Sequence, residues 1–179
     1  MICAANRKAF TLTELLVVIT IISILLGMLY GAIRTVSRYS RETITRGELA
    51  NIEAAWKNYY DYYHSWPTNG VGNSNADLEF ELDFTMARML QGFATNGLNQ
   101  DNVPFLDLTR FEKSDAPAPI NAWGANGGQR YSFKLDVDGD NTLTVKDNTA
   151  SGTNTIFRRV AVWTRNPERP GVIIGSWQQ

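Results

Sequence analysis

The sequence predicts an α+β protein in which one long N-terminal helix packs against a small C-terminal antiparallel sheet. An uninterrupted helical pattern runs from Phe10 to about His64, and alternation of apolar and polar residues begins only after Gly128. Helical patterning followed by strand patterning, with little interleaving of the two, is typical of the α+β class.

The first part of this helix is apolar enough to cross a membrane. From Phe10 to Ile33 the only charged residue is Glu14, and there is no proline. About 24 helical residues extend roughly 36 Å, which covers the hydrocarbon core of a bilayer. Arg7 and Lys8 precede the span and favour a cytoplasmic N-terminus. Glu14 is a functional-site candidate, because a carboxylate inside a membrane segment is costly unless it is paired.

The residues around Glu14 carry a resemblance to a known family. A basic leader, a small residue and then Phe-Thr-Leu-x-Glu-Leu before an apolar run is similar to the class III signal of type IV pilins and type II secretion pseudopilins. The resemblance implies that a prepilin peptidase cuts after Ala9 and N-methylates the new first residue, Phe10. It also implies that Glu14 faces the Phe10 amine of a neighbouring subunit and guides filament assembly.

The resemblance divides the chain into four segments. Residues 1–9 are expected to be a cleaved leader and residues 10–33 the transmembrane half of the helix. Residues 34–66 are its amphipathic half, and residues 67–179 form a globular domain. The implied location is the inner membrane, crossed once, with the N-terminus cytoplasmic and the globular domain periplasmic or otherwise outside the cytoplasm.

Two simpler interpretations explain the apolar run alone. An ordinary secretory signal has a shorter apolar region followed by an A-x-A-like cleavage site. A plain single-pass anchor explains the span and its basic flank, but it explains neither Glu14 nor the residues just before it.

Beyond Ile33 the helical pattern continues as an amphipathic stretch. Its apolar residues follow 3-4-3-4 spacing and are interpreted as domain core: Leu49, Ile52, Trp56, Tyr59 and Tyr63. The charged residues of this stretch, among them Glu48 and Glu53, are expected to leave that stripe clear. The Trp66-Pro67 step is expected to end the helix.

The rest of the chain is expected to begin with loops and to end with strands. Residues 69–76 are rich in Gly and Asn and predict a loop. A short helix is expected from Phe84 to Phe93, with Met86, Leu90 and Phe93 buried. Residues 99–128 are expected to be irregular. Strands are then expected at Tyr131–Leu135, Leu143–Val145, Ile156–Trp163 and Val172–Trp177.

Several further features resemble the major pseudopilins of type II secretion systems. The tyrosine-rich helix end before Trp66-Pro67 is one, and the ending Ile174-Gly-Ser-Trp177 is another. Asn121-Ala-Trp-Gly before Tyr131 is similar to their Asp-Pro-Trp-Gly…Tyr signature, although Asn and Ala replace the Asp-Pro. The only cysteine, Cys3, lies in the expected leader, so the mature chain would lack the disulfide of type IVa major pilins.

An acidic cluster is the candidate ligand site of the globular domain. Asp136, Asp138 and Asp140 alternate along the chain, and Asp147 stands where the bidentate acid of an EF-hand loop would fall. Carboxylates that converge in a turn suit calcium, and the resemblance to major pseudopilins implies calcium binding in C-terminal loops. The alternative is a solvated hairpin turn, because Asp, Gly and Asn are also turn residues.

Other motifs narrow the functional class. Gly27 and Gly31 form a G-x-x-x-G that would let helices approach closely, or they are a chance spacing of small residues. The sequence shows no phosphate loop or nucleophile motif, and His64 is its single histidine, so neither an enzyme nor a zinc site is expected. Without basic runs interleaved with aromatics, a nucleic-acid partner is not expected either.

The sequence therefore predicts a structural subunit of a helical filament, and the resemblance implies a pseudopilus that supports type II protein secretion. The implied partners are other copies of the chain, minor pseudopilins, the prepilin peptidase and the inner-membrane assembly platform. The alternatives are a type IV pilus or DNA-uptake (competence) pilin and, from a different class, a membrane-anchored binding protein.

Overall fold

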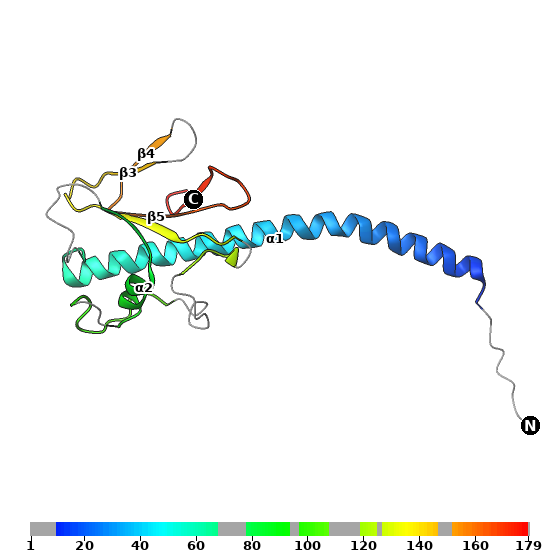
Figure 1. Cartoon of the computed structure of the whole chain (residues 1–179), viewed down its shortest axis with the longest axis horizontal. Helices are drawn as coiled ribbons and strands as arrows, with labels where there is room; N and C mark the ends of the chain where they lie inside the picture. The colour runs from blue at the N-terminus through cyan, green and yellow to red at the C-terminus, as the bar shows by residue number, and fades with distance from the viewer. Residues whose placement is uncertain are drawn as a thin grey trace, which may run out of the picture. The chain divides into compact units, whose positions relative to one another are not determined.

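The computed structural model describes residues 10–67, 78–93, 97–107, 119–124, 127–146 and 152–178. The predicted α+β architecture is confirmed, because a long helix, α1 (Leu12–Tyr63), is followed by a small antiparallel sheet (Figure 1). The other elements are β1 (Leu78–Glu81), α2 (Phe84–Leu90), β2 (Tyr131–Leu135), β3 (Leu143–Lys146), β4 (Thr153–Ile156), β5 (Val160–Arg165) and β6 (Ile173–Gly175). The chain divides into two compact units between Ser40 and Arg41.

The first unit contains the apolar part of α1. This helix is long and apolar enough to cross a membrane. Its most apolar stretch has a mean hydropathy of 2.6, and none of that stretch is buried. Hydroxyl groups of this part of α1 form hydrogen bonds with the backbone of the helix itself. Thr20 and Ser23 each donate to the carbonyl four residues earlier, at 2.7 Å. An apolar environment favours this arrangement, since it offers no other partners for polar groups.

The end of α1 agrees with the predicted stop before Trp66-Pro67. The His64 N–H donates to the Tyr60 carbonyl at 2.7 Å, and His64 takes a left-handed φ of 54°. A left-handed residue is a common way to close a helix. The Trp66 indole N–H then donates to the Asp136 carbonyl at 2.6 Å, which ties the helix end to the acidic turn.

Four antiparallel strands form the main sheet in the order β1-β2-β5-β6, and β3 and β4 form a separate two-stranded ribbon. In the sheet, Phe133 pairs with Phe80 on one side and with Val162 on the other. In the ribbon, Leu143 pairs with Ile156. The predicted strand Tyr131–Leu135 is confirmed to the residue.

The globular unit has two apolar cores, one on each face of the sheet. The stripe of α1 packs on the first face, where the ring of Trp56 lies 4.6 Å from that of Phe133. Ala161 and Trp163 of β5 point to the second face and pack with the β3-β4 ribbon. Because successive strand residues face opposite ways, β5 is buried on both sides and occupies the middle of the unit.

Four sequence expectations are wrong in detail. The expected strand Ile156–Trp163 is split between β4 and β5, because residues 157–159 carry the chain from the ribbon to the sheet. The short helix ends at Leu90, since Gly92 takes a φ of 95° just beyond it. Phe93 is 50% exposed rather than buried, with its ring under the Arg88 guanidinium, and Met86 is only half-buried.

The fourth expectation concerns charged residues on α1. The sequence predicts that Glu48 and Glu53 avoid the apolar stripe, but both are buried beside it. Glu48 accepts a hydrogen bond from the Tyr131 hydroxyl, and Glu53 is paired with cations. Each carboxylate is tolerated there because it has a partner. The predicted loop 69–76 lies outside the described residues.

Candidate functional site

The start of α1 is organised by a reciprocal pair of hydrogen bonds between Thr11 and Glu14. The Thr11 backbone N–H and hydroxyl donate to the Glu14 carboxylate at 2.9 and 2.8 Å, and the Glu14 N–H donates to the Thr11 hydroxyl at 3.3 Å. This is a capping box, in which a Thr and a Glu three residues later satisfy the free amides of a helix start. Glu14 therefore has a local role that the sequence interpretation missed, although Thr-x-x-Glu is its signature.

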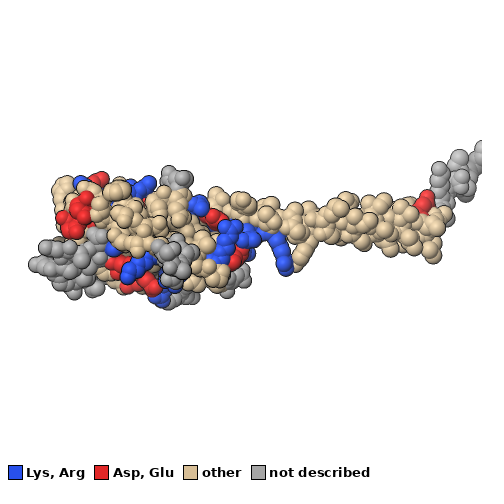
Figure 2. Space-filling view, turned by 90° about the horizontal axis from the view of Figure 1, so that it is seen from above, with Lys and Arg blue, Asp and Glu red and all other residues tan. Residues whose placement is uncertain are grey.

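The apolar part of α1 has no partner within the described structure. Its large apolar side chains are about half exposed or more, from Phe10 at 79% to Ile33 at 57%. Figure 2 shows this stretch as a continuous surface with almost no charged atoms. Exposed apolar surface on this scale marks a membrane or protein contact.

Gly27 and Gly31 leave open space on this helix. A Cβ added at either position would meet no atom within 4 Å, so the packing of this chain does not require glycine there. The two lie one turn apart on one face, where a second helix could approach closely.

Comparison with known proteins finds one match at this end of the chain. Residues 4–30 match the prokaryotic N-terminal methylation motif. The chain carries a class III N-terminal signal. No curated protein and no solved structure matches it. The matched segment covers residues 4–9 of the expected leader, Glu14 and most of the apolar span, and with the long helix it is consistent with a type IV pilin-like protein.

The class III signal implies processing by a prepilin peptidase and assembly into pilus-like filaments. Of the two residues at the expected cut, Ala9 lies outside the described residues. Phe10, the expected methylation site, is 79% exposed and lies just before the Thr11 cap. The new amine would therefore be accessible at the start of the helix.

The acidic turn follows β2 and brings three carboxylates together. Ligand oxygens of Asp136, Asp138 and Asp140 all lie within 4.8 Å of one another. Asp136 is buried and the other two are exposed, while Asp147 lies outside the described residues. Burial raises the pKa of Asp136, and the nearby Asp138 raises it further. Hydrogen bonds from backbone N–H groups of the turn lower this pKa, but the net change is upward.

The same carboxylates also build the turn. Asp136 accepts backbone hydrogen bonds from Gly139 at 2.8 Å and Asn141 at 3.0 Å. Asp138 accepts the Asp140 N–H at 3.2 Å, and Asp140 accepts both the N–H and hydroxyl of Thr142 at 2.6 Å. The turn thus fits both interpretations from the sequence, a hairpin turn and an oxygen-rich cation site.

Asn121, the residue that replaces Asp in the partial signature, holds its loop to the sheet. Its amide donates to the Thr164 hydroxyl at 3.1 Å and to the Arg165 carbonyl at 3.0 Å. Its side-chain oxygen accepts the Gln129 N–H at 3.1 Å, and the Trp123 indole N–H donates to Glu168 at 3.0 Å. These residues stabilise the loop, a role that their resemblance to the pseudopilin signature does not by itself indicate.

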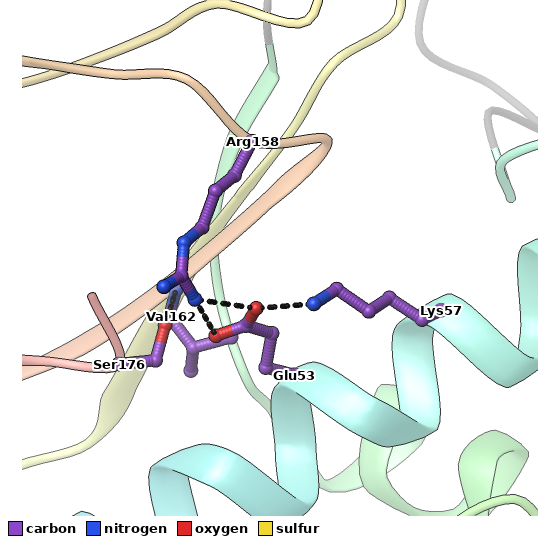
Figure 3. Close-up of polar contacts among 5 residues, drawn as sticks. All are labelled: Glu53, Lys57, Arg158, Val162 and Ser176. Carbon is purple, nitrogen blue, oxygen red and sulfur yellow. Dashed lines mark hydrogen bonds and ion pairs between the residues drawn. The ribbon is translucent and has the colours of Figure 1, made fainter. Parts of the chain in front are cut away.

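An ion-pair cluster around the buried Glu53 joins α1 to the C-terminal strands, as Figure 3 shows. The Glu53 carboxylate receives the Lys57 ammonium at 2.6 Å and the Arg158 guanidinium at 3.0 and 3.3 Å. Burial raises the pKa of Glu53, but hydrogen bonds from Lys57 and Ser176 and the two positive charges bring it below its ordinary value. The carboxylate is therefore held in its charged form.

A hollow of about 290 Å³ adjoins this cluster. It is lined by Lys57, Tyr60, Asp61, Trp66, Arg158 and Arg159. Its lysine and Arg158 are already engaged by Glu53, and Arg159 donates to Asn141 at 3.1 Å. The cations of this lining are therefore already engaged by other side chains of the protein.

Proposed function

We propose that this protein is a structural subunit of a pseudopilus that supports type II protein secretion. One combination carries the proposal: a class III methylation motif leads into a helix that is exposed, apolar and charged only at Glu14. A motif of this kind supports a type IV pilin-like subunit in general. Such a subunit is structural, in keeping with the expectation that it is not an enzyme.

In this proposal the N-terminus is cytoplasmic and the second unit lies outside the cytoplasm. Arg7 and Lys8 favour that orientation, but the four arginines that follow the span, at positions 34, 38, 41 and 46, outweigh them, so flanking charge as a whole does not support it. The class III signal is the stronger argument, since its peptidase acts on the cytoplasmic side.

Assembly is proposed to pair Glu14 of one subunit with the free amine of Phe10 in the next. Two opposite charges removed from water together cost less than either charge alone, provided that they meet with good geometry. Gly27 and Gly31 would then let neighbouring helices approach. The other partners are the minor pseudopilins and the inner-membrane assembly platform.

Secretion is favoured over a type IV pilus by three features of the chain. No cysteine follows Cys3, so no disulfide can close a C-terminal loop. A Trp123-Gly124 step resembles the pseudopilin signature, and an acidic turn follows β2. In a strain that lacks the protein, we expect loss of exported enzymes from the medium while surface pili and DNA uptake persist. Loss of pili or uptake with normal secretion would instead support the pilin alternative.

We further propose that Asp136, Asp138 and Asp140 bind calcium, with Asp147 as a fourth ligand. Convergence of three carboxylates and the raised pKa of Asp136 both favour a cation that offsets their repulsion. Asp138→Asn is the sharpest test, because Asn keeps an oxygen for the Asp140 N–H while removing one charge. Calcium should raise the melting temperature of the unchanged protein and raise that of the variant much less. Equal melting with calcium and with chelator would refute the site.

A further inference from the structure

Two arginines mark the C-terminal end of the apolar span. Arg34 follows Ile33 directly, and Arg38 lies one helical turn further on, so both occupy one face of α1. Residues 15–40 contain these two cations and no acid. Residues 34–46 contain four arginines and one acid, Glu42, which lies one turn beyond Arg38, so this stretch carries a net charge of +3.

Tyrosines accompany these arginines in an amphipathic arrangement. The Arg34 guanidinium lies 4.8 Å from the centre of the Tyr30 ring and donates to its hydroxyl at 2.8 Å. Tyr30 and Tyr39 are 61% and 72% exposed. Exposed tyrosines beside arginine are typical of the membrane–water interface, where the ring is apolar and its hydroxyl is wet.

The length of the helix places this group at the right depth. Glu14 and Arg34 are 20 residues apart, which corresponds to roughly 30 Å along a helix, about the thickness of the hydrocarbon core. When the polar start of α1 lies at one surface, Arg34 therefore reaches the headgroups of the other. Long arginine side chains extend toward that layer and carry their charge out of the hydrocarbon.

We propose that Arg34 and Arg38 bind the phosphate groups of anionic phospholipids in the leaflet at the C-terminal end of the span. This inference rests on the proposed function, since it requires that the first unit cross a membrane. Guanidinium groups match phosphate oxygens in charge and in hydrogen-bonding geometry. The contact fixes how deeply the subunit sits in the bilayer, and it must break when the subunit leaves the bilayer for a filament.

Native mass spectrometry of the full chain in mild detergent tests the proposal, with phosphatidylglycerol and phosphatidylcholine as probes. The unchanged protein should retain phosphatidylglycerol in preference to phosphatidylcholine. Arg34→Gln with Arg38→Gln should lower phosphatidylglycerol affinity roughly 25-fold, because each arginine near a charged surface contributes about fivefold. Arg34→Lys with Arg38→Lys should keep most of the affinity.

A second charge-matched variant controls for net charge. Arg88→Gln with Arg130→Gln removes two cations from the globular unit and should leave lipid binding unchanged. The proposal is overturned if the double glutamine variant at positions 34 and 38 binds phosphatidylglycerol normally, or if inorganic phosphate displaces the lipid at equal concentration. The first outcome would fit arginines that pair with acids of a neighbouring subunit instead.

Insertion is measured on the same samples, by resistance to carbonate extraction from vesicles. A chain that inserts but shows no preference for anionic lipid contradicts only this inference. A chain that carbonate extracts contradicts the membrane-spanning role itself, and the inference fails with it.

Discussion

Arg158, in the turn between β4 and β5, reaches Glu53 of α1 with one guanidinium nitrogen 3.0 Å from Oε1 and 3.3 Å from Oε2. Glu53 is only 5% exposed, and its second cation, Lys57, comes from the next turn of the same helix. The pair joins segments 105 residues apart in sequence, so it ties the helix to the strands that complete the globular unit.

Loss of Arg158 should therefore cost more than loss of Lys57. Arg158→Ala leaves the buried Glu53 with one partner, and we expect a loss of about 2 kcal/mol in unfolding free energy. Lys57→Ala should cost only about 0.5 kcal/mol, because Lys57 is half exposed and lies four residues away on the same helix. Denaturant unfolding of the full chain in mild detergent measures both, and the reverse ranking would contradict this account of the cluster.

Replacement of Asn121 by the aspartate of the pseudopilin signature should destabilise this protein. Asn121→Asp replaces an amide that donates to the Arg165 carbonyl with a carboxylate that repels it. Because this group is fully buried, we expect a loss of about 1–3 kcal/mol. Thermal unfolding of Asn121→Asp beside Asn121→Ala checks the cause. If the aspartate variant is as stable as the unchanged protein, donation by the Asn121 amide is not what holds the loop.

Enlarging Gly27 should affect association and leave the single chain intact. Gly27→Leu fits the monomer because a side chain there meets open space, yet it fills the surface on which a second helix would pack. Cross-linking of the full chain in bilayers should show at least about tenfold less dimer, a loss of at least about 1.4 kcal/mol of association. Ala32→Leu adds similar bulk on another face of the exposed helix and should associate normally. Equal effects of the two substitutions would argue that Gly27 has no special place in packing.

The two roles of Glu14, in the helix cap and in assembly, can be separated by the choice of substitution. Glu14→Gln keeps an oxygen for the Thr11 N–H, so the capping box survives without the charge. Glu14→Ala removes both the oxygen that accepts the Thr11 N–H and the charge. If charge pairing with the Phe10 amine drives assembly, both variants should insert normally and enter filaments at least about tenfold less. Normal assembly of the Gln variant, measured by filament cross-linking, would assign Glu14 to the cap alone.

The parts of the fold that sequence analysis predicted well are those with strong local patterns. The strand Tyr131–Leu135 alternates cleanly between buried and half-buried positions, and its predicted bounds hold. The helix end before Trp66-Pro67 likewise depends on neighbouring residues alone, since proline disfavours the helical conformation in the residue before it.

What sequence analysis missed depends on contacts between distant residues. Glu48 and Glu53 resemble ordinary surface acids until Tyr131 and Arg158, far along the chain, are brought against them. The strand β1 carries two glutamates in four residues, a composition that disfavours strands, and it forms by pairing with β2. At the N-terminus, by contrast, the matched motif is contiguous, so the same residues were recognisable without any fold.

The central claim is that this chain is processed as a class III precursor to become a filament subunit. The intact mass of the protein purified from its native membrane tests that claim most directly. We predict a mature chain that lacks Met1 to Ala9, begins at Phe10 and carries one added methyl group on its terminal amine. A chain that keeps residues 1–9, or that begins at Phe10 without the methyl group, would contradict the account.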